Sequence, residues 1–192
     1  MSAPGMTGGA ALAAKLKEIA KKAGEANTLR VGFLSGSTYP DKANTPVATV
    51  AAIQEFGAPR AGIPPRPFFR SMIAAKSPRW GKDLAAILAH NGYDAPNALA
   101  LMGERISSQL VESIERMDSP ALSPVTLMLR KMRSDDQGLQ VTRTTVNEAA
   151  RRVAAGESYA GVNTAVLVDS GHMKSSIAYQ VADGPKTKAG SA

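Results

Sequence analysis

Hydrophobic side chains recur at three- and four-residue steps over much of this chain, a spacing that predicts helices with one apolar face. The clearest case runs from about Ala95 to Met117, where Asp94 can cap the first turn and Pro96 stands near its start. The apolar stripe of this segment consists of Leu99, Met102, Ile106, Leu110, Ile114 and Met117. We therefore expect one long amphipathic helix here.

Shorter helices are expected on both sides of it. Val47 to Phe56 predicts a short buried helix that ends before Gly57. A segment from Thr144 to Ala155 has Thr144 or Thr145 as its cap and Gly156 as its stop. A further helix is predicted at Ala10 to Ala23, packed on a sheet with the helix's lysines in solvent. Two more are predicted, one from Pro67 through Ile73 towards Lys76 and a separate one from Trp80 to His90.

Two segments have the composition and alternation of strands. They are Leu29 to Leu34 and Ile177 to Val181. Together with the helices they predict an α+β fold, in which a small and mainly antiparallel sheet is packed with several helices.

The domain organisation follows from the same pattern. We expect residues 1–9 to form a flexible leader and residues 10–132 together with 164–183 to form a single α+β domain. Residues 133–163 are polar and predict an insertion or mobile arm of low core content, and residues 184–192 form a polar tail.

Composition narrows the function. The 192 residues include no cysteine, which excludes disulfides, thiolate zinc sites and cysteine nucleophiles. No cofactor motif, signal peptide or membrane-spanning run is recognisable, so a protein without cofactors or membrane contact is expected. The formal net charge of +7 and the pI near 9.8 favour acidic partners and leave open a basic accessory protein that binds nucleic acid.

Catalytic groups are scarce. His90 and His172 are the only histidines, and His90 suits the C-terminal cap of a helix. Asp169, Ser170 and His172 offer the residue types of a hydrolase, but close neighbours in sequence rarely reach triad geometry. Asp169, Ser170 and Gly171 more simply predict a structural corner, in which an Asp or Ser side chain caps a short helical turn. We expect no enzyme.

The most unusual segment is basic and rich in proline and phenylalanine. It contains Pro64, Pro65, Arg66, Pro67, Phe68, Phe69 and Arg70. Three prolines within four residues favour an extended path. The phenylalanines either fill the core or dock on a partner, because arginine and aromatic residues are enriched at interfaces. Both interpretations hold if one ring points inward and the other outward.

The order of several short motifs resembles a family of tailed-bacteriophage neck and tail-completion proteins, which are also described as virion morphogenesis or minor tail components. In that family an "EFG" element precedes an "R-P-F-x-R" element, and a "L-x-D-T/S-G" element follows near the C-terminus. The matching residues here are Glu55-Phe56-Gly57, Arg66-Pro67-Phe68-Phe69-Arg70 and Leu167-Val168-Asp169-Ser170-Gly171, with Arg30-Val31-Gly32-Phe33 before them and Ser123-Pro124-Val125-Thr126 between the last two.

The resemblance implies a structural role at the joint between capsid and tail, within the virion and after synthesis in the host cytoplasm. It implies a homo-oligomeric ring, for example a hexamer, around the DNA channel. Its partners would be other neck and tail proteins, such as portal-adjacent rings and the tail tube or terminator, and DNA would pass only as the genome. The motifs do not separate a neck ring from a tail-completion protein. Residues 133–163 are longer than the family pattern leads us to expect.

Overall fold

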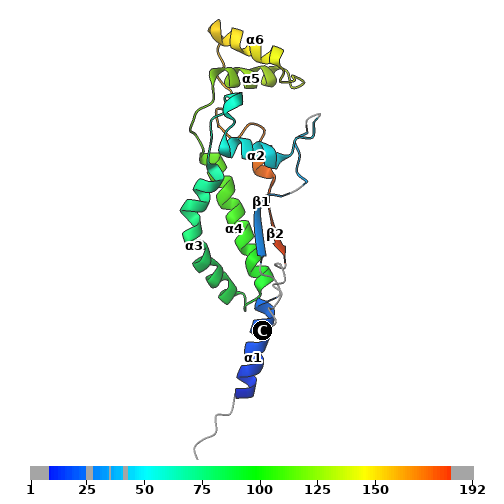
Figure 1. Cartoon of the computed structure of the whole chain (residues 1–192), viewed down its shortest axis with the longest axis vertical. Coiled ribbons are helices and arrows are strands. Elements are labelled where there is room, and N and C mark those ends of the chain that lie inside the picture. The colour runs from blue at the N-terminus through cyan, green and yellow to red at the C-terminus, as the bar shows by residue number, and fades with distance from the viewer. Residues whose placement is uncertain (1–8, 25–27, 35, 41–42, 183–192) are drawn as a thin grey trace, which may run out of the picture. The chain divides into compact units, whose positions relative to one another are not determined.

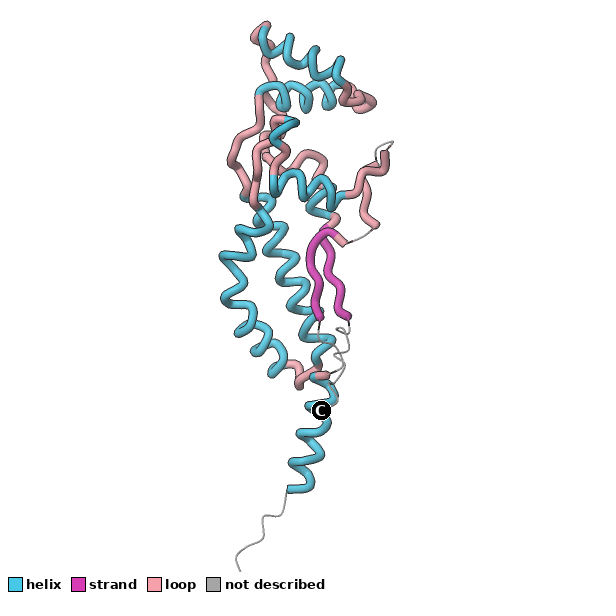
Figure 2. Tube along the Cα trace, in the orientation of Figure 1, coloured by secondary structure: helices cyan, strands magenta, loops and turns pink. Residues whose placement is uncertain are grey.

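The computed structural model describes residues 9–24, 28–34, 36–40 and 43–182 of the chain. These residues form seven α-helices and a two-stranded antiparallel sheet, so that about 59% of the chain is helical and 10% is strand. Figure 2 shows this predominance of helix over strand. The predicted α+β fold class is confirmed.

The elements follow one another along the chain as labelled in Figure 1. They are α1 (Gly9–Ala23), β1 (Thr28–Phe33), α2 (Val47–Phe56), the 3₁₀ turn η1 (Pro59–Ala61), α3 (Phe68–His90), α4 (Ala95–Arg116), α5 (Pro124–Asp135), α6 (Arg143–Ala154), α7 (His172–Ser175) and β2 (Ile177–Ala182).

The chain divides into two compact units. Unit 1 comprises residues 1–34, 72–110 and 177–192, and unit 2 comprises residues 35–71 and 111–176. The helices α3 and α4 each contribute residues to both units.

The sheet belongs to unit 1, where β1 pairs with β2 so that Val31 lies opposite Tyr179. Both predicted strands are confirmed. Figure 1 shows the two strands alongside α4, and the contact is close at Gly103. A Cβ atom on Gly103 would lie 2.6 Å from the ring of Tyr179, so only glycine leaves room for the strand at this point.

The long amphipathic helix is confirmed as α4. Asp94 caps it as expected, because its carboxylate accepts a hydrogen bond from the backbone N–H of Asn97 at 3.0 Å. Its predicted apolar stripe is largely buried, with Met102, Leu110 and Ile114 almost completely enclosed. Burial of this stripe, rather than helix propensity, is the main stabilisation expected for such a helix.

Two predictions about other helices were wrong. The segments ending near Lys76 and beginning at Trp80 form one helix, α3, which continues through Pro78 and is bent in Figure 1. Proline removes one backbone hydrogen bond and commonly bends a helix without ending it when packing holds both sides. The second concerns α1, which was expected to pack on the sheet. Leu16 of this helix is 57% exposed and does not show that packing.

Of residues 133–163, Ala149 is buried, and Leu139, Val153 and Tyr159 are partly buried. This segment contains α6, which packs on α5 around the buried Met128, Met132 and Ala149, and Figure 1 shows the two helices side by side. The cap of α6 is also not the predicted one. Thr142 caps it by a capping box with Thr145, two residues before the first candidate. Ser123 caps α5 in the ordinary way, accepting from the N–H of Thr126 at 3.1 Å.

Candidate functional site

The motif residues of α2 and α3 meet at the carboxylate of Glu55 in unit 2. Glu55 is only 6% exposed. Its two oxygens accept hydrogen bonds from the backbone N–H groups of Phe69 at 2.8 Å and Arg70 at 3.2 Å, in the first turn of α3. A carboxylate at the N-terminus of a helix accepts hydrogen bonds from N–H groups that have no partner within the helix, and its negative charge interacts favourably with the helix dipole. Glu55 therefore joins α2 to α3.

Arg70 strengthens the same junction from outside. Its Nε lies 3.2 Å from Glu55 Oε1, and its Nη2 donates to the backbone oxygen of Glu55 at 3.0 Å. The guanidinium also covers the ring of Phe56, 5.2 Å from the ring centre, which is the distance of a cation–π contact. Arg70 thus holds both the acid and the aromatic residue of the Glu55-Phe56-Gly57 element.

Gly57, directly after α2, allows the segment at Ile63 and Pro65 to pass close to the end of that helix. It has a φ of 76°, and a Cβ atom there would lie 2.8 Å from the backbone nitrogen of Pro65 and 2.9 Å from the oxygen of Ile63. Both atoms belong to the backbone and cannot move aside easily. The glycine therefore fixes how closely the proline segment approaches the end of α2.

The seven residues predicted to bind a partner have different environments. Phe68 is almost completely buried at 1% exposure, and its backbone oxygen accepts from Ser113 Oγ at 2.7 Å. Phe69 is half-buried, while Pro67 is partly covered. Arg66 is buried, whereas Pro64, Pro65 and Arg70 are exposed. Phe68 therefore fills the core, while Pro64, Pro65 and Arg70 lie at the surface of the segment.

The largest exposed aromatic surface nearby lies on α2. Phe56 is 66% exposed and Ile53, one helical turn before it, is 37% exposed. Arg70, with a side chain 54% exposed, covers part of the Phe56 ring. We call Ile53, Phe56 and Arg70 the α2 patch. Sequence reasoning treated Phe56 as part of a buried helix and so missed it.

A second feature of unit 2 is a cleft of about 770 Å³. Its charged lining residues are three arginines, Arg66, Arg130 and Arg133, and a single carboxylate, Asp169. We call it the arginine cleft. Polar groups of Ser123 and Thr126 and apolar side chains of α5 and of residues 166–167 complete its wall.

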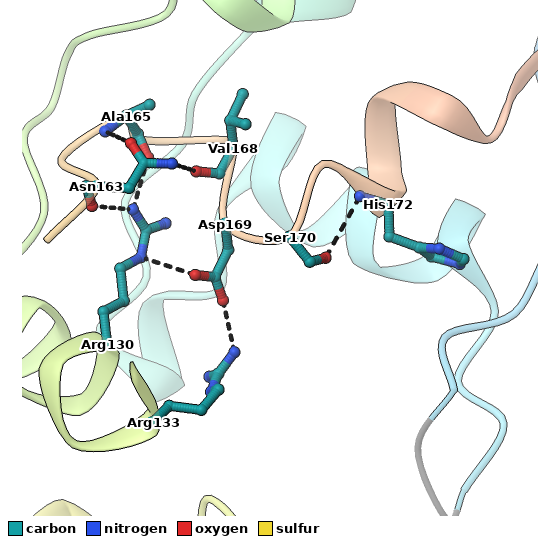
Figure 3. Close-up of polar contacts among 8 residues, drawn as sticks. All are labelled: Arg130, Arg133, Asn163, Ala165, Val168, Asp169, Ser170 and His172. Atoms are coloured by element: carbon teal, nitrogen blue, oxygen red, sulfur yellow. Dashed lines mark hydrogen bonds and ion pairs between the residues drawn. The ribbon is translucent and has the colours of Figure 1, made fainter. Parts of the chain in front are cut away.

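The predicted corner at Asp169 lines this cleft. Figure 3 shows its polar contacts. Asp169 does not cap α7. Its two oxygens instead meet Arg130 Nε at 3.3 Å and Arg133 Nη1 at 2.6 Å, both from α5. Arg130 further donates through Nη1 to the backbone oxygens of Asn163 at 2.6 Å and Ala165 at 2.9 Å. Two arginines thus fasten the loop before α7 to α5.

The N-cap of α7 is Gly171, not Asp169 or Ser170, so no side chain caps this helix as predicted. Ser170 nevertheless bonds its first residue. Ser170 Oγ accepts from the backbone N–H of His172 at 3.3 Å, at the start of α7. Gly171 has a φ of 77°, in the left-handed region that glycine adopts without strain. The expectation that a side chain of this corner bonds the following turn is confirmed for Ser170.

His172 turns away from Ser170, as Figure 3 shows. Its Nε2 lies 2.9 Å from the backbone oxygen of Thr38, and its ring packs on Tyr39 with ring centres 4.9 Å apart. Asp169 is paired with arginines rather than with the imidazole. The three residues considered for a hydrolase therefore do not form a relay in this arrangement.

The described residues lack two other features, a metal-binding cluster and a membrane-spanning helix. No cluster of three or more His, Asp or Glu side chains that could hold a metal ion exists among the described residues. None of the described helices combines the length and hydrophobicity needed to span a bilayer.

Comparison with known proteins does not identify a family. No protein-family model, no curated protein and no solved structure matches the chain. The likeness to phage neck and tail-completion proteins therefore stays an expectation that rests on the sequence motifs.

Proposed function

We propose that this chain is a structural assembly protein of a tailed-phage virion, acting in head–tail joining or tail completion as one member of a ring around the DNA channel. The observation that carries the proposal is the junction at Glu55. The "EFG" and "R-P-F-x-R" elements, on which the resemblance depends, are held together there by one buried carboxylate. A shared architectural role explains why such residues would occur in this order.

The α2 patch supplies a surface for the neighbouring protein. An exposed phenylalanine covered on one side by arginine has the composition enriched in the centres of interfaces. Glu55 fixes Arg70 in place before any partner arrives, which lowers the entropy lost on docking. We propose that an adjacent neck or tail protein covers Phe56.

The test is co-purification of the full chain with the products of the genes flanking its own. Phe56→Ala should leave thermal unfolding nearly unchanged yet remove the partner from the complex. Leu101→Ala, which truncates a side chain 39% exposed outside the α2 patch, is the matched control and should retain it. Phe68→Ala should instead unfold much of the protein, because truncating a buried phenylalanine costs about 3–5 kcal/mol.

Failure of both the wild-type chain and the control to retain a partner would contradict the proposal. Equal retention of the partner by Phe56→Ala and wild type would show that docking uses another surface. The basic accessory protein expected as the alternative would bind a short DNA duplex with an affinity that falls steeply as salt rises.

A further inference from the structure

Arg66 is a buried cation without a counter-ion. It is 6% exposed. Its guanidinium donates to two neutral acceptors, the side-chain oxygen of Gln54 at 2.8 Å and the backbone oxygen of Pro120 at 3.3 Å. No carboxylate in the described part of the chain pairs with it, and no described residue accepts from its Nη2. Buried charges are normally paired, so this arrangement is an exception that needs a cause.

The surroundings of Arg66 make its charge less favourable still. Burial lowers the pKa of the Arg66 guanidinium from its usual value, and the positive charge of Arg130 lowers this pKa further. Arg130 has a side chain only 10% exposed and already shares Asp169 with Arg133. The arginine cleft therefore holds an excess of buried positive charge that one carboxylate does not balance.

We infer that the arginine cleft binds an acidic peptide segment of a partner protein, with a carboxylate of that segment received by Arg66. A guanidinium offers paired donors that match the two oxygens of a carboxylate, and burial excludes the water that would weaken the contact. The arriving carboxylate supplies the missing negative charge.

The shape and lining of the cleft favour a peptide over nucleic acid. A volume of about 770 Å³ lies in the range of pockets that hold small molecules or a few residues of an extended chain. Apolar side chains of Ile63, Leu122 and Val166 lie in the same wall and suit an apolar residue next to the acidic one. Phosphates of a duplex are read mainly by exposed cations, whereas Arg66 and Arg130 are recessed. This inference does not rest on the proposed role in a virion, so either can fail alone.

The inference is tested with the full chain and two fluorescein-labelled peptides, one of alternating Leu and Glu and one of alternating Leu and Gln. Fluorescence anisotropy should show binding of the Leu–Glu peptide and much weaker binding of the Leu–Gln peptide. Arg66→Gln should weaken Leu–Glu binding by about 10- to 100-fold, the effect of losing a hydrogen bond between charged groups. Arg151→Gln removes the same charge from an exposed site on α6, where the side chain is 75% exposed, and should bind like wild type.

A second measurement covers the case in which Arg66→Gln does not fold. Titration of the isotope-labelled wild-type chain with the Leu–Glu peptide should shift the backbone amide signals of Ser123, Thr126 and Val166, which line the cleft. Shifts confined to residues elsewhere would overturn the inference, as would equal affinity for the Leu–Gln peptide or no binding at all. Displacement of the Leu–Glu peptide by a short DNA duplex at lower concentration would also overturn it, in favour of nucleic acid.

Discussion

Arg70 contacts the carboxylate oxygen Oε1 of Glu55 twice, once through its backbone N–H at 3.2 Å and once through its side-chain Nε at 3.2 Å. The acid thereby binds both the start of α3 and the side chain that covers Phe56. Since the Glu55 side chain is only 7% exposed, its charge depends on these donors. The junction between α2 and α3 therefore depends on a single carboxylate.

Replacing this carboxylate by an amide of the same shape should destabilise the protein. In the wild type, both oxygens of Glu55 accept hydrogen bonds from backbone N–H groups. In Glu55→Gln one of these N–H groups would face the amide NH₂, which is a donor, and Arg70 would lose its ion-pair partner. We expect a loss of about 1–3 kcal/mol in the free energy of unfolding, measured by urea denaturation. Glu115→Gln, which breaks an exposed pair with Lys174, should cost less than about 1 kcal/mol. Similar losses for both variants would contradict the special role of Glu55.

Gly57 and Gly62 allow steric crowding to be separated from backbone strain. Both have positive φ, 76° and 67°, but a Cβ atom at Gly62 would meet nothing within 4 Å. Gly62→Ala should therefore cost only the conformational penalty of about 1 kcal/mol. Gly57→Ala should lower the thermal midpoint further, because the backbone of Ile63 and Pro65 must shift. An equal effect at the two positions would disprove the close approach at Gly57.

Gly103 and Gly81 should respond to alanine in opposite directions. Both lie in helices, where alanine is favoured over glycine by about 0.5–1 kcal/mol. Gly81 has open space around its Cα, so Gly81→Ala should raise the thermal midpoint. Gly103→Ala should lower it, because the new methyl group would overlap the Tyr179 ring and push β2 away from α4. Circular dichroism melts of the two variants give the comparison.

The chain's regular elements could be predicted from sequence because each depends on local pattern. The apolar positions of α4 repeat at helical spacing, so the sequence predicted nearly the same bounds for this helix as the structure has. The sequence predicted two helices where the structure has the single helix α3, which contains Pro78. A proline in the sequence indicates that one backbone hydrogen bond is lost, but it does not indicate whether packing on both sides keeps the helix continuous. The Thr142 cap was missed because several threonines compete within a few residues.

The candidate sites depend on contacts between distant residues, which one sequence does not reveal. Asp169 meets Arg133 although the two lie 36 positions apart, and Glu55 reaches Phe69 across 14. The sequence pattern therefore identified Arg66 and Asp169 as unusual, but it did not show which residues each of them contacts. The same limit explains why Phe56 was expected inside and lies outside, since its helix is apolar on more than one side.

The corner at residues 169–171 distinguishes a scaffold from a catalyst. Ser170→Ala removes one hydrogen bond to the N–H of His172 and should cost about 1 kcal/mol or less in stability, with assembly unaffected. Asp169→Asn should be more harmful, because it leaves Arg130 and Arg133 without their shared carboxylate. Thermal unfolding and co-purification with the partner give both readouts. A Ser170→Ala protein that folds normally but loses all biological function would instead support the hydrolase alternative.

The central claim, that the chain works as a ring member in virion assembly, is tested most directly by native mass spectrometry. The full chain is co-expressed with the products of its flanking genes, and the masses of the complexes are measured beside those of Phe56→Ala. The proposed function predicts a closed ring of identical copies carrying a neighbouring protein, and loss of that neighbour from Phe56→Ala. A wild-type chain that stays monomeric and without any of these proteins would contradict the account.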